Sequence, residues 1–347
     1  MNTSVGFALG AAVLFGLSTP LAKQLLGSVP PVLLGGLLYL GSGIGLITAR
    51  LLRDRGWQAT GLQPGEWPWL AGAIVFGGVL GPVALMVGLQ QTAASTASLL
   101  LNLEAVMTAV LAWVAFKENA DRRIVLGMLA ILAGGVILSW PGEGSAATGW
   151  NWGAVLIVLA CLCWAMDNNL TRKVSASDAL FIAGSKGLVA GVVNVSIAPA
   201  LGNAWPGSTT ILGAMVVGLL GYGISLVLFV LALRGLGTAR TGAYFSVAPF
   251  VGALVSLVWL GESVGSAFWI ACALMGWGVR LHLTERHEHE HTHEAMEHSH
   301  GHVHDEHHQH LHDFDWDGRE PHVHRHRHQT ITHKHPHFPD IHHRHVH

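Results

Sequence analysis

Long uninterrupted apolar stretches constrain this chain more than any other feature. Each is about 20 residues long, the length that a helix needs to cross the hydrocarbon core of a bilayer. About ten of them follow one another, over residues 4–25, 30–51, 67–88, 93–116, 122–140, 152–170, 178–201, 209–232, 238–260 and 264–284. A backbone in lipid must satisfy its own hydrogen bonds, and the run 154–159 lacks the alternation of a barrel strand. We therefore predict an all-α polytopic membrane protein with about ten transmembrane helices.

Composition points to the same solvent. Charged residues make up only 12% of the 347 residues, whereas a soluble domain of average composition has roughly 25%. The three cysteines, Cys161, Cys163 and Cys272, fall inside apolar segments and are interpreted as buried thiols. The N-terminus has no basic region and no convincing cleavage site, so it is interpreted as a first span and not as a removable signal peptide. Because the sequence has no phosphate-binding loop and no catalytic triad, we predict no enzyme activity and no required cofactor. The predicted partners are the lipid bilayer and a small-molecule substrate, with no nucleic acid.

The connections between the spans differ in charge. Lys and Arg are in excess in the cytoplasmic loops of membrane proteins. On one side of the membrane the connections carry Arg50, Arg53, Arg55, Lys117, Arg122, Arg123, Arg172, Lys173, Arg234, Arg240, Arg280 and Arg286. On the other side the connections 139–151 and 202–210 carry none, and Lys23 is the one basic residue. We predict a bacterial-type inner membrane protein with both termini in the cytoplasm.

The chain also repeats itself at a spacing of about 144 residues, which is a signature of a repeat architecture. Ala109 matches Ala253, and Glu118 matches Glu262, without a gap. Each half then holds about five helices, and an odd number inserts the second half upside down relative to the first. We predict two inverted five-helix repeats, residues 1–141 and 150–284, with a substrate site near the membrane midplane between them. Residues 285–347 form a separate tail.

The segments 95–106, 116–118 and 127–134 carry a resemblance to a known family. They contain small residues, a Leu run, Glu104 and a Lys-Glu ending, and the chain resembles the drug/metabolite transporter superfamily of the type with paired EamA domains. Two positions depart from the pattern: Ala105 stands where Pro is usual, and Ala248 stands before Pro249 where Glu is usual. Over residues 1–284 the resemblance implies a ten-helix secondary carrier, often an exporter of amino acids or other small metabolites. It names no substrate.

Ionisable residues within the predicted spans are candidates for the transport site, because a charge at the bilayer centre costs roughly 2.5–3.5 kcal/mol on insertion scales. Glu104 lies near the middle of the fourth span. Its carboxylate could bind a cationic substrate group or carry a proton; the alternative is a structural carboxyl bonded to a neighbouring helix. Asn102 lies two positions earlier, on another face of the helix, and is more readily interpreted as a contact between helices.

The second half of the chain offers further candidates. Asp167 and Asn168 belong to a polar row in the sixth span, which either lines a water-filled entrance or marks the end of the helix. Lys186 lies in the seventh span. It could pair with Asp167 or with the carboxylate of the fourth span, or its stem could extend to the cytoplasmic edge. Tyr222 and Tyr244 could face the cavity.

All 24 histidines lie at or after His282, where the apolar sequence ends. From residue 285 aliphatic residues nearly vanish, so no core can offset the ordering entropy and we expect a disordered cytoplasmic tail. Imidazole suits Zn, Ni, Co and Cu, which are the metals that the tail could bind. The predicted ligands belong to His-x-His and His-His steps: His287, His289, His291, His293, His298, His300, His302, His304, His307, His308, His322, His324, His326, His328, His342 and His343.

Three functions remain open. We favour a secondary transporter that exports a small amino-acid-like or drug-like metabolite, with or without proton coupling, and has a metal-binding regulatory tail. The second is a divalent-metal exporter whose tail captures Zn, Ni or Co, although the membrane part has no histidine before His282 and few carboxylates. The third is a membrane-anchored metal buffer or sensor. The tail also has two interpretations without metal: a pH-responsive segment, since histidine titrates near pH 6.5, or dispensable sequence.

Overall fold

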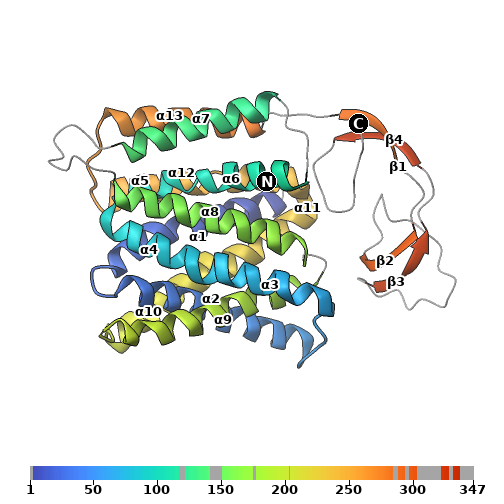
Figure 1. Cartoon of the computed structure of the whole chain (residues 1–347), viewed down its shortest axis with the longest axis horizontal. Helices are drawn as coiled ribbons and strands as arrows, with labels where there is room; N and C mark the ends of the chain where they lie inside the picture. Colours follow the sequence, from blue (N-terminus) through green and yellow to red (C-terminus); the bar gives the residue numbers. More distant parts are fainter. Residues whose placement is uncertain are drawn as a thin grey trace. The chain divides into compact units, whose positions relative to one another are not determined.

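A computed structural model describes residues 3–116, 122–140, 151–174, 177–202, 204–283, 288–293, 297–302, 322–327 and 331–336. The helices of residues 3–283 pack side by side as a bundle (Figure 1). The α-helices are α1 (Thr3–Leu25), α2 (Pro31–Asp54), α3 (Trp67–Ala73), α4 (Gly81–Gln91), α5 (Ala94–Leu100), α6 (Leu103–Phe116), α7 (Arg122–Ser139), α8 (Trp152–Arg172), α9 (Ala179–Ala200), α10 (Ser208–Gly218), α11 (Ser225–Phe245), α12 (Ala248–Trp259) and α13 (Ser266–Leu283). A 3-10 turn, η1 (Pro64–Glu66), precedes α3, and two π-helical segments, η2 (Ile74–Leu80) and η3 (Leu219–Ile224), join α3 to α4 and α10 to α11.

The predicted all-α membrane fold is confirmed. Within the described residues, eight segments are long and apolar enough to span a membrane: Thr3–Leu25, Pro31–Asp54, Pro64–Gln91, Ala94–Leu111, Arg122–Ser139, Trp152–Thr171, Ala179–Ala200 and Ser208–Ala232. The last two predicted spans correspond to shorter apolar helices, Ala248–Trp259 and Ser266–Leu281. α11 continues from the eighth predicted span to Phe245, and Ser246 and Val247 separate it from α12.

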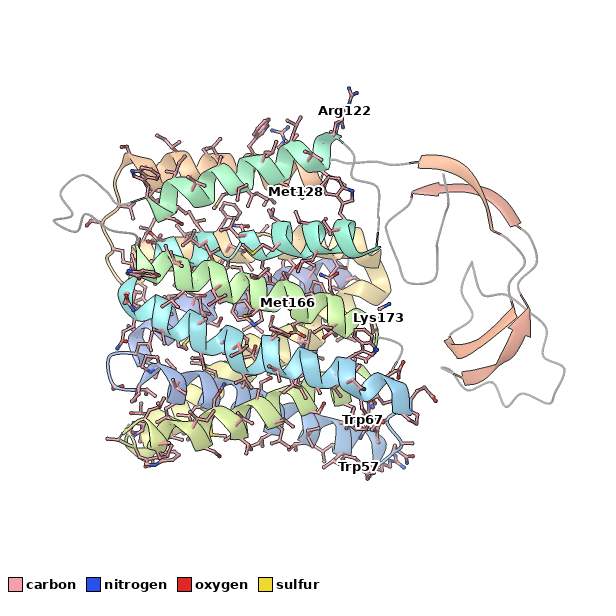
Figure 2. All side chains as sticks on the ribbon, viewed as in Figure 1. Trp57, Trp67, Arg122, Met128, Met166 and Lys173 are labelled. Atoms are coloured by element: carbon pink, nitrogen blue, oxygen red, sulfur yellow. The ribbon has the colours of Figure 1, made fainter. Side chains whose placement is uncertain are left out.

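The two ends of the bundle differ in the side chains that they carry. Figure 2 shows Trp57, Trp67, Arg122 and Lys173 at the same end, which we call the basic end. The connection between α1 and α2, which contains Ser28, lies at the opposite end, because α2 runs from that connection toward Trp57. The grouping of basic residues and tryptophans is the pattern expected of a cytoplasmic membrane interface.

Close contacts between small residues hold the helices together. α2 packs along α9, and a Cβ added at Gly43 would overlap the backbone nitrogen of Leu188. A Cβ added at Gly187 would lie 2.7 Å from the backbone nitrogen of Gly43. Lipid provides no hydrophobic force between helices, so backbone approach of this kind supplies much of the packing energy.

An ion-pair cluster joins α2 to α9 at the basic end. Arg50 is 1% exposed; its Nε donates to Asp178 Oδ2 at 3.2 Å, and its guanidinium lies over the rings of Trp57 and Phe181. The Asp178 carboxylate also accepts from Arg53 and from two backbone N–H groups in the first turn of α9. Burial opposes ionisation of Asp178, but the hydrogen bond from Arg53, with those from the backbone and Arg50, outweighs it and holds the pKa below its ordinary value.

The described tail residues form four short strands: β1 (Glu288–His293), β2 (Glu297–His302), β3 (His322–Arg327) and β4 (Ile331–Pro336). β1 pairs antiparallel with β4, and β2 with β3. The His-x-His steps have the two-residue period of a strand, and antiparallel pairing satisfies the backbone groups of both partners. Seven of the predicted metal ligands lie outside the described residues: His287, His304, His307, His308, His328, His342 and His343.

Candidate transport site

Two helices are interrupted part-way across the bundle. α5 ends at Leu100 and α6 begins at Leu103, whereas α11 ends at Phe245 and α12 begins at Ala248. The two breaks lie one repeat length apart. Interrupted helices leave backbone groups without a helical partner, and transporters use them to frame substrate sites. The first break places Glu104 in the opening turn of α6, where the helix dipole favours a negative charge by about 0.3–1 kcal/mol.

The Glu104 carboxylate is held by an amide from a neighbouring helix. Asn168 of α8 donates from Nδ2 to Glu104 Oε1 at 2.9 Å and to Thr108 Oγ1 at 3.2 Å. Glu104 is half-buried, and among the described residues no ion pair joins it to a basic side chain. The carboxylate is thus fixed in place without being neutralised by a cation.

A second carboxylate, that of Asp167, belongs to the residue before Asn168 on α8 and is neutralised by Lys186. Lys186 Nζ lies 2.5 and 2.6 Å from the two carboxylate oxygens of Asp167. The hydroxyl of Thr171 donates to Asp167 Oδ1 at 2.8 Å. The side chains of Lys186 and Asp167 are only 17% and 9% exposed. Of the pairings that the sequence left open, the structure shows the one between Lys186 and Asp167.

The π-helical segment η2 packs against the carboxylate of the Asp167–Lys186 pair. A Cβ added at Gly77 would overlap the Asp167 carboxylate, so only glycine fits there. π-Helical turns alter the backbone hydrogen bonding, and the carbonyl of Gly77 accepts from Tyr39 Oη at 2.8 Å and from Trp164 Nε1 at 3.0 Å. Sequence reasoning missed Tyr39 and Trp164, because a tyrosine or tryptophan in an apolar span looks like ordinary core. The adjacent glycines Gly77 and Gly78 were the one available signal.

The other predicted site residues lie apart from the two carboxylates. Asn102 donates to a carbonyl one turn back at 3.0 Å and reaches Met275 Sδ at 4.0 Å, so it contacts α13. Tyr222 packs on Tyr39, with ring centroids 5.6 Å apart, and on Phe15, with ring centroids 5.9 Å apart. Tyr244 lies partly buried on α11, and within the described residues no contact links it to the carboxylates.

The two halves differ in charge at equivalent positions. The glycine of η2 lies against Asp167, and the equivalent glycine of η3, Gly221, lies against Ser18, with its added Cβ 2.6 Å from the Ser18 Cβ. Likewise, the position one repeat length after Glu104 is Ala248, in the first turn of α12. Both carboxylates therefore have small neutral counterparts, and the charged cluster exists in only one of the two related places.

Comparison with known proteins places the chain in a family. The model of the EamA-like transporter family matches residues 2–140 and again residues 151–284. The chain belongs to the EamA-like transporter family. It is similar to an uncharacterized transporter of Methanothermobacter thermautotrophicus, with 28% identity over 270 residues that cover 73% of this chain and 78% of that protein. It is also 25% identical over 264 residues to the uncharacterized inner membrane transporter YedA of Escherichia coli K12, covering 73% of this chain and 82% of YedA.

A solved crystal structure shares the fold. It aligns with a TM-score of 0.61 at 21% sequence identity and covers 80% of this chain and 95% of the solved chain. The family assignment confirms the resemblance predicted from the sequence. The protein is a multi-pass membrane transporter, and its helices lie in a lipid bilayer.

Proposed function

We propose that this EamA transporter exports a small metabolite with a positively charged group, such as an amino-acid-like or drug-like amine, in exchange for protons. The observation that carries the proposal is the Glu104 carboxylate, which has an amide partner but no cation among the described residues. An uncompensated charge at this depth costs roughly 2.5–3.5 kcal/mol. A substrate cation or a proton supplies the missing positive charge. Asp167 is not available for this role, because Lys186 already neutralises it.

The proposed direction follows from the charge of the loops. Arg122 and Lys173 lie at the basic end, which we assign to the cytoplasm, so both termini and the tail are cytoplasmic. Glu104 and Asn168 lie on the part of α6 and α8 between the helix break and the basic end. The carboxylate is therefore placed to receive a substrate from the cytoplasmic side. The activity is transport without covalent change of the substrate, so we propose no enzymatic reaction and no required cofactor.

The test is uptake into reconstituted vesicles that contain the full-length protein. A panel of amino acids and drug-like amines is measured with and without a pH gradient. We expect at least one amine to be moved against its gradient when the proton gradient is imposed, and the Glu104→Gln variant to lose this accumulation. Glu66→Gln is the matched control, because Glu66 is a carboxylate at the start of α3 whose partner is a backbone N–H group at 2.8 Å. Equal accumulation by Glu104→Gln and by Glu66→Gln would contradict the proposal.

The tail, in our proposal, binds divalent metal ions and regulates the transporter. In the β2–β3 pair, histidines oppose histidines, and residues directly opposite each other in an antiparallel pair lie on the same face. The backbone register pairs His298, His300 and His302 with His326, His324 and His322. In the β1–β4 pair, His289 and His291 are in register with His335 and His333. Imidazole suits Zn, Ni, Co or Cu, and the density of histidines in the sequence is what supports metal binding by the tail.

A divalent-metal exporter is the rival function that the tail favours. Within the described membrane helices, however, no group of three or more His, Cys, Asp or Glu side chains is placed to hold a metal ion. Deletion of residues 286–347 and the Glu104→Gln variant separate the functions when metal tolerance and metal content of cells are measured. If both changes lower tolerance, the protein exports metal. If only the deletion changes the metal content, the tail is a buffer or sensor.

A further inference from the structure

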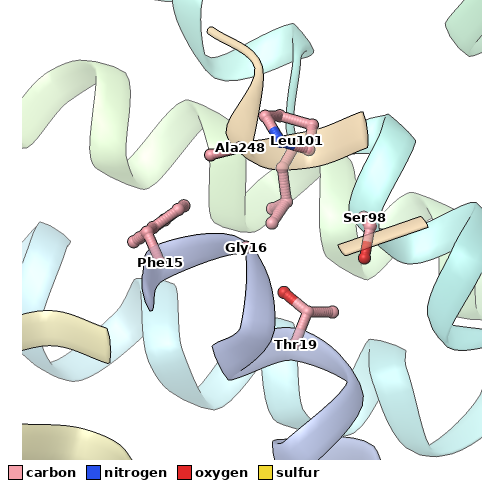
Figure 3. A pocket seen from close by; sticks show the side chains of 7 residues that line it. Phe15, Gly16, Thr19, Ser98, Leu101 and Ala248 are labelled. Carbon is pink, nitrogen blue, oxygen red and sulfur yellow. The ribbon is translucent and has the colours of Figure 1, made fainter. Parts of the chain in front are cut away.

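A narrow gap lies where the two interrupted helices meet α1. In this structure the gap is too tight to hold even a water molecule, so it is closed and not a formed ligand pocket. The gap is formed by α1, by the end of α5 and by the start of α12 (Figure 3). Its lining residues are Phe15, Gly16, Thr19, Ser98, Leu101, Ala248 and Pro249.

Backbone contact keeps the gap closed. A Cβ added at Gly16 would lie 2.5 Å from the carbonyl oxygen of Ala248. A Cβ added at Gly252, one turn further along α12, would lie 2.7 Å from Ser98 Oγ and 2.8 Å from the carbonyl oxygen of Gly16. These contacts need no side-chain interlocking and break no ion pair when they separate.

One polar group in the gap has no partner in the closed arrangement. Ser98 is 1% exposed, and its Oγ has no hydrogen-bond partner. Figure 3 shows the Ser98 hydroxyl and the Thr19 hydroxyl at the same side of the gap. A buried hydroxyl without a partner destabilises the state that buries it. The Ser98 hydroxyl becomes satisfied only when water or a ligand enters the gap.

The repeat relates this gap to the charged cluster. Ala248 lies one repeat length after Glu104. Gly77 lies against Asp167 as Gly221 lies against Ser18, so by these contacts Thr19, next to Ser18, corresponds to Asn168, next to Asp167. The glutamate–asparagine contact of one half thus has an alanine–threonine counterpart that lines the gap in the other half. In an inverted repeat the two places lie on opposite sides of the midplane.

We propose that this gap is the outer half of the substrate path, closed in this structure, and that the hydroxyls of Ser98 and Thr19 bind an uncharged hydrogen-bonding group of the substrate. Phe15 and Pro249 flank the hydroxyls with apolar surface. The ligand chemistry is therefore a polar neutral group next to an apolar one. This inference rests on the proposed transport function, and it adds a second contact region that contains no charge.

Charged contacts cover the gap at the end opposite the basic end. Lys23 Nζ, one turn beyond Thr19, donates to the carbonyls of Leu89 at 2.7 Å and of Thr92 at 2.9 Å. The Glu262 carboxylate accepts from the backbone N–H groups of Ala94 and of the following residue at 2.7 and 2.8 Å. The Lys23 ammonium thus donates to carbonyls at the end of α4, and the Glu262 carboxylate accepts from the first amides of α5. These contacts fix the half-helix that carries Ser98.

Cysteine labelling with a positively charged, membrane-impermeant methanethiosulfonate reagent tests the inference in the full-length protein. The three native cysteines are first replaced by serine, and Thr19→Cys and Ser98→Cys are introduced singly. Ser28→Cys and Gln58→Cys report on the two sides of the membrane. Ser225→Cys is the buried control, because Ser225 is 2% exposed and its hydroxyl is satisfied by the carbonyl of Ala11 at 2.9 Å.

We expect Thr19→Cys and Ser98→Cys to react from the Ser28 side faster than Ser225→Cys by at least tenfold, the ratio that a difference of about 1.4 kcal/mol in opening free energy produces. Reaction no faster than at Ser225→Cys, or reaction only from the Gln58 side, would overturn the inference.

A second measurement uses Ser98→Ala and Ser225→Ala. Because the Ser98 hydroxyl has no partner in the closed state, Ser98→Ala should leave the melting temperature unchanged or raise it, while it raises KM for the amine found in the vesicle panel. Ser225→Ala should lower the melting temperature and leave KM unchanged. A lowered melting temperature in Ser98→Ala with an unchanged KM would assign the hydroxyl a structural role. If Glu104→Gln keeps full activity while the gap is labelled, the proposed substrate cation fails and the outer path stands.

Discussion

The ion pair between Asp167 and Lys186 gives the sharpest quantitative prediction. Both side chains are largely buried, and Nζ lies 2.5 Å from Oδ1. Removing one partner of a buried pair leaves an uncompensated charge, which costs about 3–5 kcal/mol, whereas replacing both by neutral residues of similar size is close to neutral. We therefore expect Asp167→Asn and Lys186→Met each to destabilise the protein by about 3–5 kcal/mol. The double variant should be within about 1 kcal/mol of the parent protein, because it leaves no bare charge.

The assay is thermal unfolding of the purified protein in detergent, followed by tryptophan fluorescence. For a chain of this length, about 1.4 °C per kcal/mol is expected, so each single variant should unfold roughly 4–7 °C below the parent protein. Arg53→Met is the matched control, because it breaks the contact of Asp178 with an arginine whose side chain is 48% exposed. Exposed pairs contribute about 0–1 kcal/mol, so its shift should be about 1.4 °C at most. Additive losses in the double variant would refute the reasoning, because they would show that the two charges do not compensate each other.

The same variants separate a structural pair from a working one. If the pair only holds α8 to α9, the double variant transports the amine normally once its stability is restored. If Lys186 also contacts the substrate or exchanges its partner during transport, the double variant stays folded and inactive. The vesicle uptake assay with and without the pH gradient distinguishes these outcomes, and the melting temperature shows that both concern a folded protein.

Three further predictions concern single positions. Glu262→Gln weakens the cap on α5, so it should destabilise the protein by about 0.5–2 kcal/mol and speed the labelling of Ser98→Cys, whereas equal labelling with and without the substitution would deny Glu262 this role. Gly77→Ala places a Cβ on the Asp167 carboxylate and should cost about 1–3 kcal/mol, while Gly72→Ala, whose Cβ would meet only the flexible end of a leucine side chain at 3.1 Å, should cost less in the same unfolding assay. Asp178→Asn should destabilise the protein by about 0.5–2 kcal/mol at neutral pH. The pKa of Asp178 is lowered in the folded state, so its contribution to stability is present above pH ~4 and is lost as the pH falls through the lowered pKa. Unfolding experiments under acid conditions should therefore give the parent protein and the variant the same stability.

The sequence predicted the parts of this protein that depend on local composition. Apolar length located most spans, and the depth of Glu104 in the fourth span marked it as a candidate. The pairing of Lys186 with Asp167 joins residues on two different helices, so it depends on how α8 and α9 pack, and sequence alone left two partners open. The gap at Ser98 was not predicted, because a serine among alanines and leucines carries no signal until α1 and α12 close over it.

The charge difference between the two halves also bears on coupling. A substrate cation that leaves Glu104 for the gap meets Ser98 and Thr19 but no carboxylate among the lining residues. Its departure leaves Glu104 bare within the membrane, at a cost of roughly 2.5–3.5 kcal/mol, unless a proton takes its place. In the proposed mechanism, the same uncompensated carboxylate that recognises the substrate also requires a proton in exchange for it. Reversing the pH gradient across the vesicles should reverse the direction of substrate accumulation. Accumulation that is the same with either gradient would show that transport is not coupled to protons, even if Glu104 binds the substrate.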